Sequence, residues 1–303
     1  MYILITGGTG FLGHSLCQCL LAANHQVTVI SRQPQQIFTR YSGRVRALPS
    51  LEDLLVSDSF DAVINLAGAS LIDQAWTSQR KRELYASRVH LTEALVDWLQ
   101  HVQDKPKVLL SMSTIGWYGN QDETMLDEDS FYQDSYLHQL CADWERAALT
   151  AESLGIRVCV MRTGIVLGRE GGILKRLLPV FAFNMGGYAG NGKQWLSWIA
   201  LHDWVTAIAF LLETPSTKGV FNLTSPQPAT HADFADTLAR HLHRRAYLQI
   251  PAMAIRLVMG EMSSLALDSQ RCLPSRLLQA GFSFRTPALT KALAFELQVP
   301  HSH

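Results

Sequence analysis

The chain has 303 residues, of which 48% are hydrophobic, so it is long enough for one large domain or for two lobes with separate cores. Its 26 basic and 26 acidic residues give a net charge of zero, and the basic residues do not cluster, so nucleic acid is not an expected partner. No apolar run reaches the roughly 18 residues of a membrane helix, and a glycine turn interrupts the apolar start. The five cysteines lack metal-ligand spacing, which predicts no metal site and reduced thiols in the cytoplasm.

The first stretch of the chain carries the most informative motif. An apolar segment, ILIT at 3–6, runs into glycines and then into a helical apolar pattern. Gly7, Gly10 and Gly13 have the spacing of a dinucleotide fingerprint, in which glycines allow a tight turn, backbone approach of the pyrophosphate and close helix packing. The N–H groups around Phe11 and Leu12 then face the diphosphate. We predict a pyrophosphate site here; a glycine-rich turn without a ligand is the alternative.

The end of the second predicted strand, QVTVI at 26–30, indicates the type of dinucleotide. Ser31 and Arg32 follow this strand. An NAD site usually has an acidic residue here that binds the ribose 2′-OH, whereas arginine suits a 2′-phosphate. We therefore expect NADP(H), and the alternative is a solvated surface arginine.

The segments that follow alternate between strand and helix patterns. Leu66, Ala67 and Gly68 end the fourth strand, and their small size lets the adenine-ribose half of a dinucleotide lie against the backbone, although an ordinary turn has a similar sequence. Alternation of this kind predicts an α/β fold with a doubly wound parallel Rossmann sheet. The predicted strands are 45–48, 61–66, 108–111 and 157–161, and the predicted helices are 51–55, 78–100 and 136–154.

The pattern changes after residue 168. Residues 169–202 are rich in glycine and too irregular for another crossover unit, which is typical of a lid or substrate lobe. A helix at 203–212 and a strand at 220–223 return to the sheet, and helices are expected at 232–243 and around 255–259. We predict a Rossmann domain over 1–168 and 203–224, with a smaller C-terminal α+β substrate lobe made of 169–202 and 225–303.

Polar side chains after the fifth strand are the first catalytic candidates. Hydroxyl groups at the carboxyl end of a central strand lie beside the nicotinamide in doubly wound sheets. Thr114 and Tyr118 have this position. The Thr114 hydroxyl either binds a substrate carbonyl or hydroxyl, or caps the strand end.

Several motifs together resemble the extended short-chain dehydrogenase/reductase superfamily. They are TGGTGFLG at 6–13, NLAG at 65–68 and RTGIVLG at 162–168. The chain is also similar to the YfcH-like subfamily of the NAD-dependent epimerase/dehydratase family, through LCADWE at 140–145, GNGKQWLSWI at 190–199 and RCLPSRLLQAGFSF at 271–284. The resemblance covers nearly the whole chain. It implies NADP(H) across the strand tips, with Glu83 and Arg88 as further nucleotide contacts.

The resemblance also shows what this chain lacks. In the superfamily a tyrosine is the acid/base, and a lysine four residues later lowers its pKa. Tyr136 has the position of that tyrosine, but Leu140 has the position of the lysine, and none of the eight tyrosines has a lysine at this spacing. Thr114, Tyr118 and Tyr136 are therefore catalytic candidates without the lysine that the standard mechanism of the superfamily needs.

Three functions remain open. The first is an NADP(H)-dependent oxidoreductase or epimerase acting on an unidentified small molecule. The second is an NADP(H)-binding sensor or regulatory protein without turnover, and the third is a conventional nucleotide-sugar epimerase or dehydratase, against which the missing lysine argues. The exposed face of the helix at 78–100 is a candidate homodimer surface.

Overall fold

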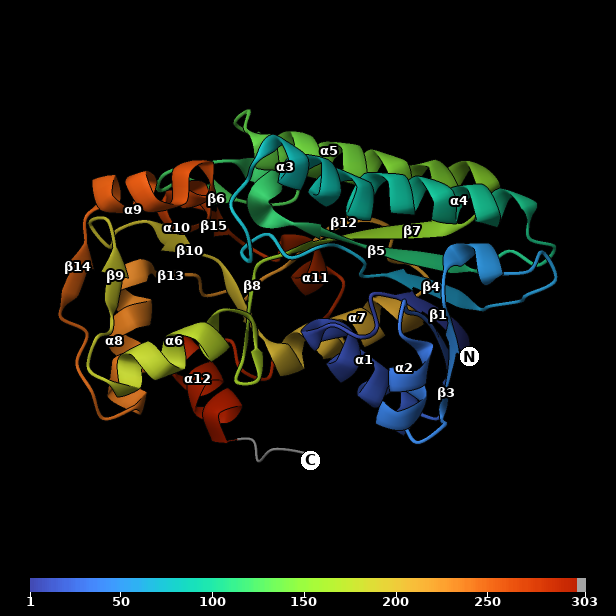
Figure 1. Ribbon diagram of the computed structural model, residues 1–303, viewed down its shortest axis with the longest axis horizontal. Helices are drawn as coiled ribbons and strands as arrows, with labels where there is room; N and C mark the ends of the chain where they lie inside the picture. Colours follow the sequence, from blue (N-terminus) through green and yellow to red (C-terminus); the bar gives the residue numbers. More distant parts are fainter. Residues whose placement is uncertain (299–303) are drawn as a thin grey trace.

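A seven-stranded parallel sheet organises the computed structural model, which describes residues 1–298 (Figure 1). The strand order β12-β7-β5-β4-β1-β2-β3 places the reversal between β1 and β4, and this is the doubly wound arrangement. The predicted Rossmann fold is confirmed. Residues 299–303 of the predicted C-terminal lobe lie outside the described residues. The strands of the sheet are β1 (Tyr2–Thr6), β2 (Gln26–Ile30), β3 (Val45–Leu48), β4 (Ala62–Asn65), β5 (Val108–Thr114), β7 (Arg157–Thr163) and β12 (Gly219–Leu223).

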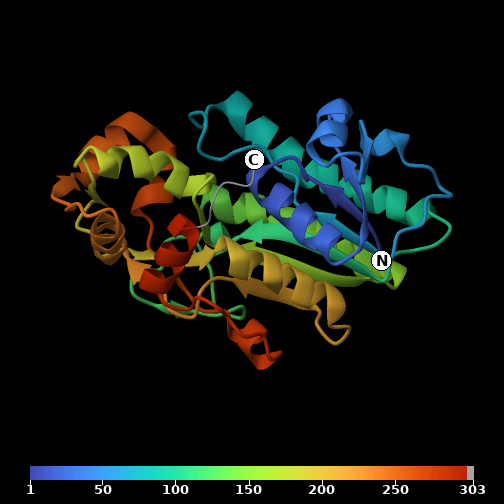
Figure 2. The same ribbon diagram turned by 90° about the horizontal axis from the view of Figure 1, so that it is seen from below.

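Helices cover both faces of this sheet (Figures 1 and 2). Successive strand residues point to opposite faces, so Ile3 and Ile5 pack with Leu16, whereas Leu4 packs with Leu95. No helix in the described part of the chain is both long and apolar enough to cross a membrane. One face carries α1 (Phe11–Ala22), α2 (Pro34–Arg40) and α7 (Leu201–Glu213), and the other carries α3 (Ser78–Tyr85), α4 (Leu91–His101) and α5 (Tyr136–Leu149).

The helix predicted at 78–100 contains a local distortion. A π-helical turn, Ala86–His90, joins α3 to α4. Two side chains of this turn hold the loop that follows β4: the Ser87 hydroxyl accepts the Ala69 N–H at 3.0 Å, and Arg88 donates to the Ala69 carbonyl at 2.8 Å. Such widened turns are often found at functional sites, and this one fixes the loop at a strand tip.

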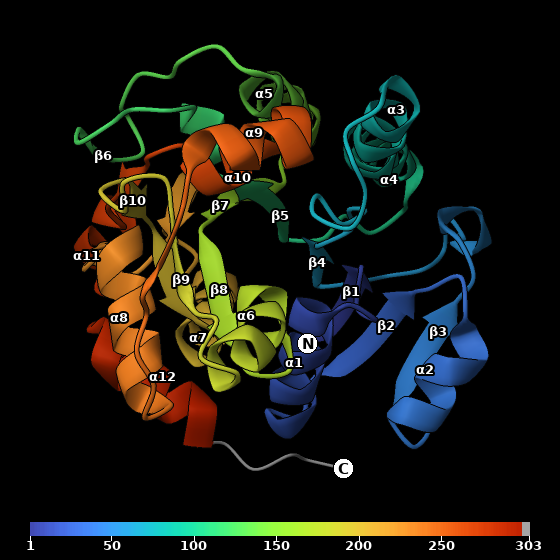
Figure 3. The ribbon, with the colours of Figure 1, turned by 60° about the vertical axis from the view of Figure 1, so that its left-hand side comes forward.

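The C-terminal lobe packs beside the carboxyl ends of the strands, with α6 next to α1 and α9 next to α5 (Figure 3). Its helices surround small two-stranded sheets, which agrees with the α+β prediction. Helix α6 lies in the segment predicted to be irregular. Leu174 and Phe181 of α6 nevertheless join a core that contains Trp198 and Leu238. The elements of this lobe are β8 (Ile165–Gly168), α6 (Gly172–Ala182), β9 (Gly187–Ala189), β10 (Trp195–Leu196), β11 (Trp198–Ala200), β13 (Ala229–Thr230), α8 (His231–His241), β14 (Leu248–Ile250), α9 (Ala252–Met259), α10 (Ser264–Leu267), β15 (Arg271–Cys272), α11 (Ser275–Gln279) and α12 (Leu289–Gln298).

A buried polar network holds the edge formed by β5, β7 and β12. Arg162 and Glu145, which are 3% and 6% exposed, form a two-pronged pair with N–O distances of 2.9 and 2.8 Å. Ser113 donates to Glu145 at 2.6 Å, and Arg162 donates to the Tyr118 hydroxyl at 3.2 Å. Tyr118 in turn donates to Asn222 on β12 at 2.8 Å. The network therefore joins three strands and α5.

We expect Glu145→Gln to lower the free energy of unfolding by about 3 kcal/mol or more, because the Arg162 charge would stay buried without its counter-charge. Urea denaturation measures this loss. The control is Arg146→Gln on the same helix, which breaks a pair with Asp143 in which the arginine side chain is 73% exposed. That change should cost less than about 1 kcal/mol. Equal losses in the two variants would contradict the importance of the buried pair.

Candidate cofactor and substrate site

The three glycines of the first turn have different surroundings. Gly7 has φ of +73°, and a Cβ there would lie 2.7 Å from the backbone of Leu66. A Cβ on Gly13 would lie 2.3 Å from the Gly7 carbonyl oxygen. A Cβ on Gly10 would meet only that oxygen, at 3.5 Å. Gly7 and Gly13 are therefore required by packing, whereas Gly10 faces open space.

Helix α1 begins at this open side without a side-chain cap. His14 donates the first intrahelical bond, to the Gly10 carbonyl at 2.8 Å, so the N–H groups of residues 11–13 lack intrahelical partners. The side chains here serve packing: the Phe11 ring lies against the β8–α6 turn, where a Cβ on Gly171 would be 2.1 Å from it, and Leu12 packs against the core. The backbone of this turn thus has the N–H groups without intrahelical partners that an anion site needs, and pyrophosphate binding by them stays a prediction.

Charged side chains of the helical segment that follows fix the loop after β4. Arg88 is 6% exposed and donates to the carbonyls of Leu84 and Ala69, and its guanidinium carbon would lie 3.1 Å from a Cβ on Gly68. Glu83 pairs with Arg80 at 3.0 Å, and Arg80 donates to the Ser70 carbonyl at 2.6 Å. Leu66 and Ala67 are buried in the same loop. In the structure Glu83 and Arg88 support the loop, and direct nucleotide contact by them stays a prediction.

The region expected to hold a 2′-phosphate contains two arginines. The buried Ser31 hydroxyl accepts the Gln33 N–H at 3.1 Å, and the exposed Arg32 side chain has no partner within residues 1–298. Beside them, a groove of about 680 Å³ between Thr9 and α2 is lined in part by Arg40, which donates to the Thr9 carbonyl at 3.1 Å. No sequence motif singled out Arg40, because only the packing of α2 brings it to the glycine turn.

Tyr118 does not have the surroundings of an acid/base. Its side chain is fully buried, and its hydroxyl contacts the Asp127 carbonyl, Asn222 and Arg162. Burial raises the pKa of this phenol well above its usual value. The Tyr118 hydroxyl thus already serves the buried network, and its catalytic role stays a prediction.

Tyr136 lies in an aromatic cluster. Its ring is 5.1 Å from that of Trp76, and burial raises the pKa of its hydroxyl. Lys81 of α3 lies 4.5 Å above the Tyr136 ring and pairs with Glu261 at 2.5 Å. A lysine is therefore close to Tyr136, but it contacts the ring face and a carboxylate. Leu140 is buried where the usual lysine would stand.

Thr114 borders a cavity of about 170 Å³ between the two lobes, at the carboxyl ends of β5 and β7. Its hydroxyl accepts the Gly116 N–H at 3.2 Å and lies 3.4 Å from the Cys141 sulfur. Both the capping role and the substrate-facing role of Thr114 are thus compatible with its position. The residues that line the cavity are Leu71, Thr114, Ile115, Gly116, Leu137, Thr163, Gly164, Ile165, Trp195, Leu196, Ser197, His231, Ser264, Leu265, Asp268 and Gln270.

Two titratable residues of this cavity were not found from the sequence. Burial lowers the pKa of His231 to about 4. Burial also raises the pKa of Asp268, and Arg256 opposes this shift. Perturbed titratable groups in a cavity are typical of functional sites. No motif surrounds either residue in the sequence, and they meet only because the C-terminal lobe folds over the strand tips.

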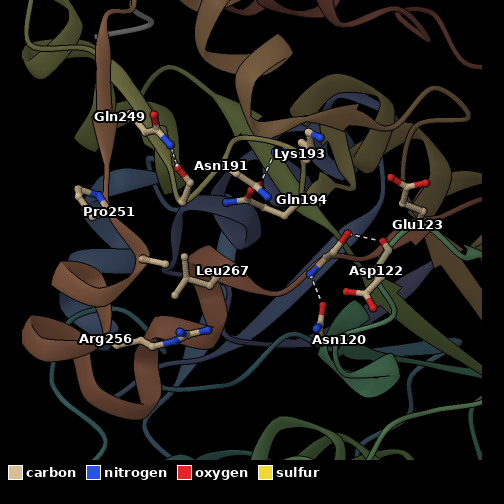
Figure 4. Close-up of a pocket in the computed structure, with 13 residues that line it drawn as sticks. Asn120, Asp122, Glu123, Asn191, Lys193, Gln194, Gln249, Pro251, Arg256 and Leu267 are labelled. Atoms are coloured by element: carbon tan, nitrogen blue, oxygen red, sulfur yellow. Dashed lines mark hydrogen bonds between the residues drawn. The ribbon is translucent and has the colours of Figure 1, made fainter.

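A second, more open pocket of about 670 Å³ lies behind one wall of this cavity (Figure 4). Leu267 and Ser269 line the pocket, whereas Asp268 and Gln270 line the cavity, so this extended segment separates the two spaces. The charged residues of the pocket have both signs, and they are Asp122, Glu123, Lys193 and Arg256.

Comparison with known proteins places this geometry in a family. Residues 3–224 match the NAD dependent epimerase/dehydratase family, and residues 250–296 match a domain of unknown function, DUF1731. The chain belongs to the NAD-dependent epimerase/dehydratase family. Its C-terminal lobe carries the second match.

Relatives of similar length agree with this assignment. The chain is 36% identical to the chloroplastic SDR39U1 homolog of Arabidopsis thaliana, over 98% of this chain and 87% of that protein. It is 36% identical to the epimerase family protein SAR0825 of Staphylococcus aureus, over 96% and 97%. Both are described as epimerase family proteins.

Solved structures show the same fold. The human epimerase family protein SDR39U1, crystallised with NADPH, has a TM-score of 0.89 and 30% identity, over 99% of this chain and 100% of that one. A nucleoside-diphosphate sugar epimerase from Corynebacterium glutamicum has a TM-score of 0.79 and 28% identity, over 98% and 58%. The fold is thus that of the epimerase family.

We expect Gly10→Val to abolish dinucleotide binding while the melting temperature stays close to that of the wild type. The valine Cβ would meet only the Gly7 carbonyl oxygen, at an ordinary contact distance of 3.5 Å, and the side chain would take up the space in front of the turn where the pyrophosphate is expected. Gly13→Ala is the contrasting variant, because its Cβ would collide with the Gly7 carbonyl and destabilise the fold. NADPH fluorescence and thermal unfolding measure the two effects. Wild-type affinity in Gly10→Val would refute the pyrophosphate site.

Proposed function

We propose that the protein is an NADP(H)-dependent oxidoreductase or epimerase that acts on a small molecule. The observation that carries this proposal is that an open helix N-terminus at Gly10 and a partly enclosed cavity at Thr114 both lie at the carboxyl ends of the strands of one parallel sheet. The human relative that was crystallised with NADPH supports the choice of cofactor.

The residues of this chain that would hold NADP(H) come from three places. The N–H groups of residues 11–13 would bind the pyrophosphate, and Arg32 and Arg40 would bind the 2′-phosphate. Ala67 and Gly68 would lie against the adenosine half. The bound nicotinamide would exchange hydride with a substrate in the cavity. The five free cysteines suit a reducing compartment, and we propose the cytoplasm.

A binding protein without turnover is the second candidate function. Leu140 replaces the usual lysine, and the Tyr118 hydroxyl is occupied by the buried network. Both observations favour a sensor or regulatory protein over a standard enzyme. A nucleotide-sugar epimerase fits less well, because no lysine or arginine lines the cavity to meet a phosphate.

Turnover separates these candidates. We expect mass spectrometry to identify NADP(H) in the purified protein, and we expect NADPH absorbance to fall when a suitable small carbonyl compound is added. An epimerase would form product without a net change in NADPH. A protein that binds NADPH but forms no product from alcohols, ketones or aldehydes would be a binding protein.

We expect Arg32→Asp to weaken NADPH binding by on the order of 10- to 100-fold and to shift the preference towards NADH, because a charge-assisted hydrogen bond is lost and a repulsive charge is added. Arg40→Gln should weaken NADPH binding without improving NADH binding. The control is Arg46→Gln, since Arg46 pairs with Asp58 at 3.1 Å on β3. Unchanged cofactor preference in Arg32→Asp would remove Arg32 from the site.

A further inference from the structure

Backbone hydrogen bonds fix the position of His231, whereas its imidazole ring forms none with the described residues. Its N–H donates to the Gln194 carbonyl at 3.0 Å, and the next N–H, that of Ala232, donates to Gly192 at 3.0 Å. The Thr230 hydroxyl caps α8 by accepting the Asp233 N–H at 3.1 Å, so the helix does not need the histidine ring. His231 lines the cavity, and its ring has no hydrogen-bond partner within residues 1–298.

Asp268 is presented in a similar way. Its N–H donates to the Ser264 carbonyl at 3.0 Å. The next residue is fixed on both sides: Ser269 donates to Asn120 at 2.8 Å and accepts the Trp195 N–H at 2.9 Å. Asp268 lines the cavity, and its carboxyl group forms no hydrogen bond or ion pair with the described residues.

Two other polar side chains of the cavity, those of Ser197 and Gln270, are already engaged in hydrogen bonds. Ser197 donates to the Gln270 carbonyl at 2.7 Å and accepts the Cys272 N–H at 2.8 Å. The Gln270 amide donates to the Gly119 carbonyl at 3.0 Å. Thr114, His231 and Asp268 are therefore the side chains best placed to recognise a ligand.

The size and charge of the cavity restrict that ligand. A volume of about 170 Å³ equals the space of roughly six water molecules, which suits a compact molecule and not a nucleotide. A carboxyl group without a lysine or arginine in the lining disfavours anionic substrates. Most of the wall is apolar, from Leu71, Leu137, Ile165 and Leu265.

We propose that Thr114, His231 and Asp268 form the polar wall of a substrate site for small, uncharged alcohols or carbonyl compounds, and that Asp268 exchanges the proton of the reaction. The proposal rests on the proposed NADP(H)-dependent function. This chain has no tyrosine–lysine pair to transfer the proton. The proposal assigns that proton transfer to a residue of the C-terminal lobe.

The step balances as follows in the direction of reduction. With NADPH bound, hydride adds to the carbonyl carbon, and NADP⁺ results. The electron pair of the C=O π bond takes the proton of the Asp268 carboxyl group, which gives an alcohol and a carboxylate. A proton from water restores the acid. Thr114 and neutral His231 donate hydrogen bonds that orient the oxygen.

Histidine NMR of the full chain tests the binding site without turnover. His231→Asn assigns the ring resonance, and cyclohexanone, cyclohexanol and UDP-glucose are the probes. We expect cyclohexanone or cyclohexanol to shift the His231 resonance in a saturable way, while the exposed His101 on α4 stays unchanged as the control. Asp268→Asn should weaken this binding at least 5-fold. Saturable shifts with UDP-glucose, or none with either small probe, would overturn the proposed site.

NADPH fluorescence on the same samples reports the proposed function separately. Loss of NADPH binding with His231 shifts intact would contradict the cofactor and leave the small-molecule site. NADPH binding without His231 shifts would contradict the site and leave the cofactor.

Kinetics with a panel of small ketones and aldehydes tests the role of Asp268. For any compound that the wild type reduces, Asp268→Asn should lower kcat by on the order of 100-fold with an unchanged Kd for NADPH, and Asp268→Glu should restore part of it. The pH profile of kcat should lose the limb that reports this carboxyl group, whose charged neighbour is Arg256. A kcat within twofold of wild type in Asp268→Asn, or binding of NADPH and cyclohexanone without hydride transfer across the panel, would overturn the proton-transfer role.

Discussion

The buried pair of Arg162 and Glu145 is the interaction on which the site depends. Removing two charges from water is costly, and the cost is offset here by two short parallel hydrogen bonds and by further bonds from Ser113 and to Tyr118. The pair holds β7 against α5, and Thr163, the next residue of β7, borders the cavity. The position of Thr163 in the cavity wall thus depends on the buried ion pair of the preceding residue, Arg162, with Glu145.

The cofactor side of the cleft depends on close packing instead. Gly7 and Gly13 have no room for a Cβ, so they bring strand, turn and helix together, and only Gly10 keeps its front open. Arg88 fixes the loop after β4, on the other side of the cleft, by donating a hydrogen bond to the Ala69 carbonyl oxygen. A charged residue next to a predicted phosphate site can therefore act on the ligand indirectly, by fixing the loop that borders it.

The features that could be predicted from the sequence are those with local causes. The glycine turn, the strand at 26–30 and the alternation of strands and helices depend on neighbouring residues, and the structure reproduces them. The buried network around Tyr118 could not be predicted, because its partners Arg162 and Asn222 lie 44 and 104 residues away. Helix α6 was missed because its flanking glycines and an internal Pro179 resemble a loop. His231 and Asp268 belong to one site only through the folding of a whole lobe.

Dividing the reaction between two lobes has a mechanical consequence. Thr114 belongs to the lobe with the cofactor turn, whereas His231 and Asp268 belong to the other, so catalytic geometry depends on how the lobes are joined. Among the described residues three ion pairs cross between them, Lys81 with Glu261, Arg176 with Asp73 and Arg276 with Asp129, and each has at least one exposed side chain. Exposed pairs contribute little and weaken with salt. The alignment therefore comes from apolar contacts, such as the cluster in which Met262 packs with Trp76 and Leu137 beside the cavity, and from hydrogen bonds such as those of Ser269 to Asn120 and Gln270 to Gly119.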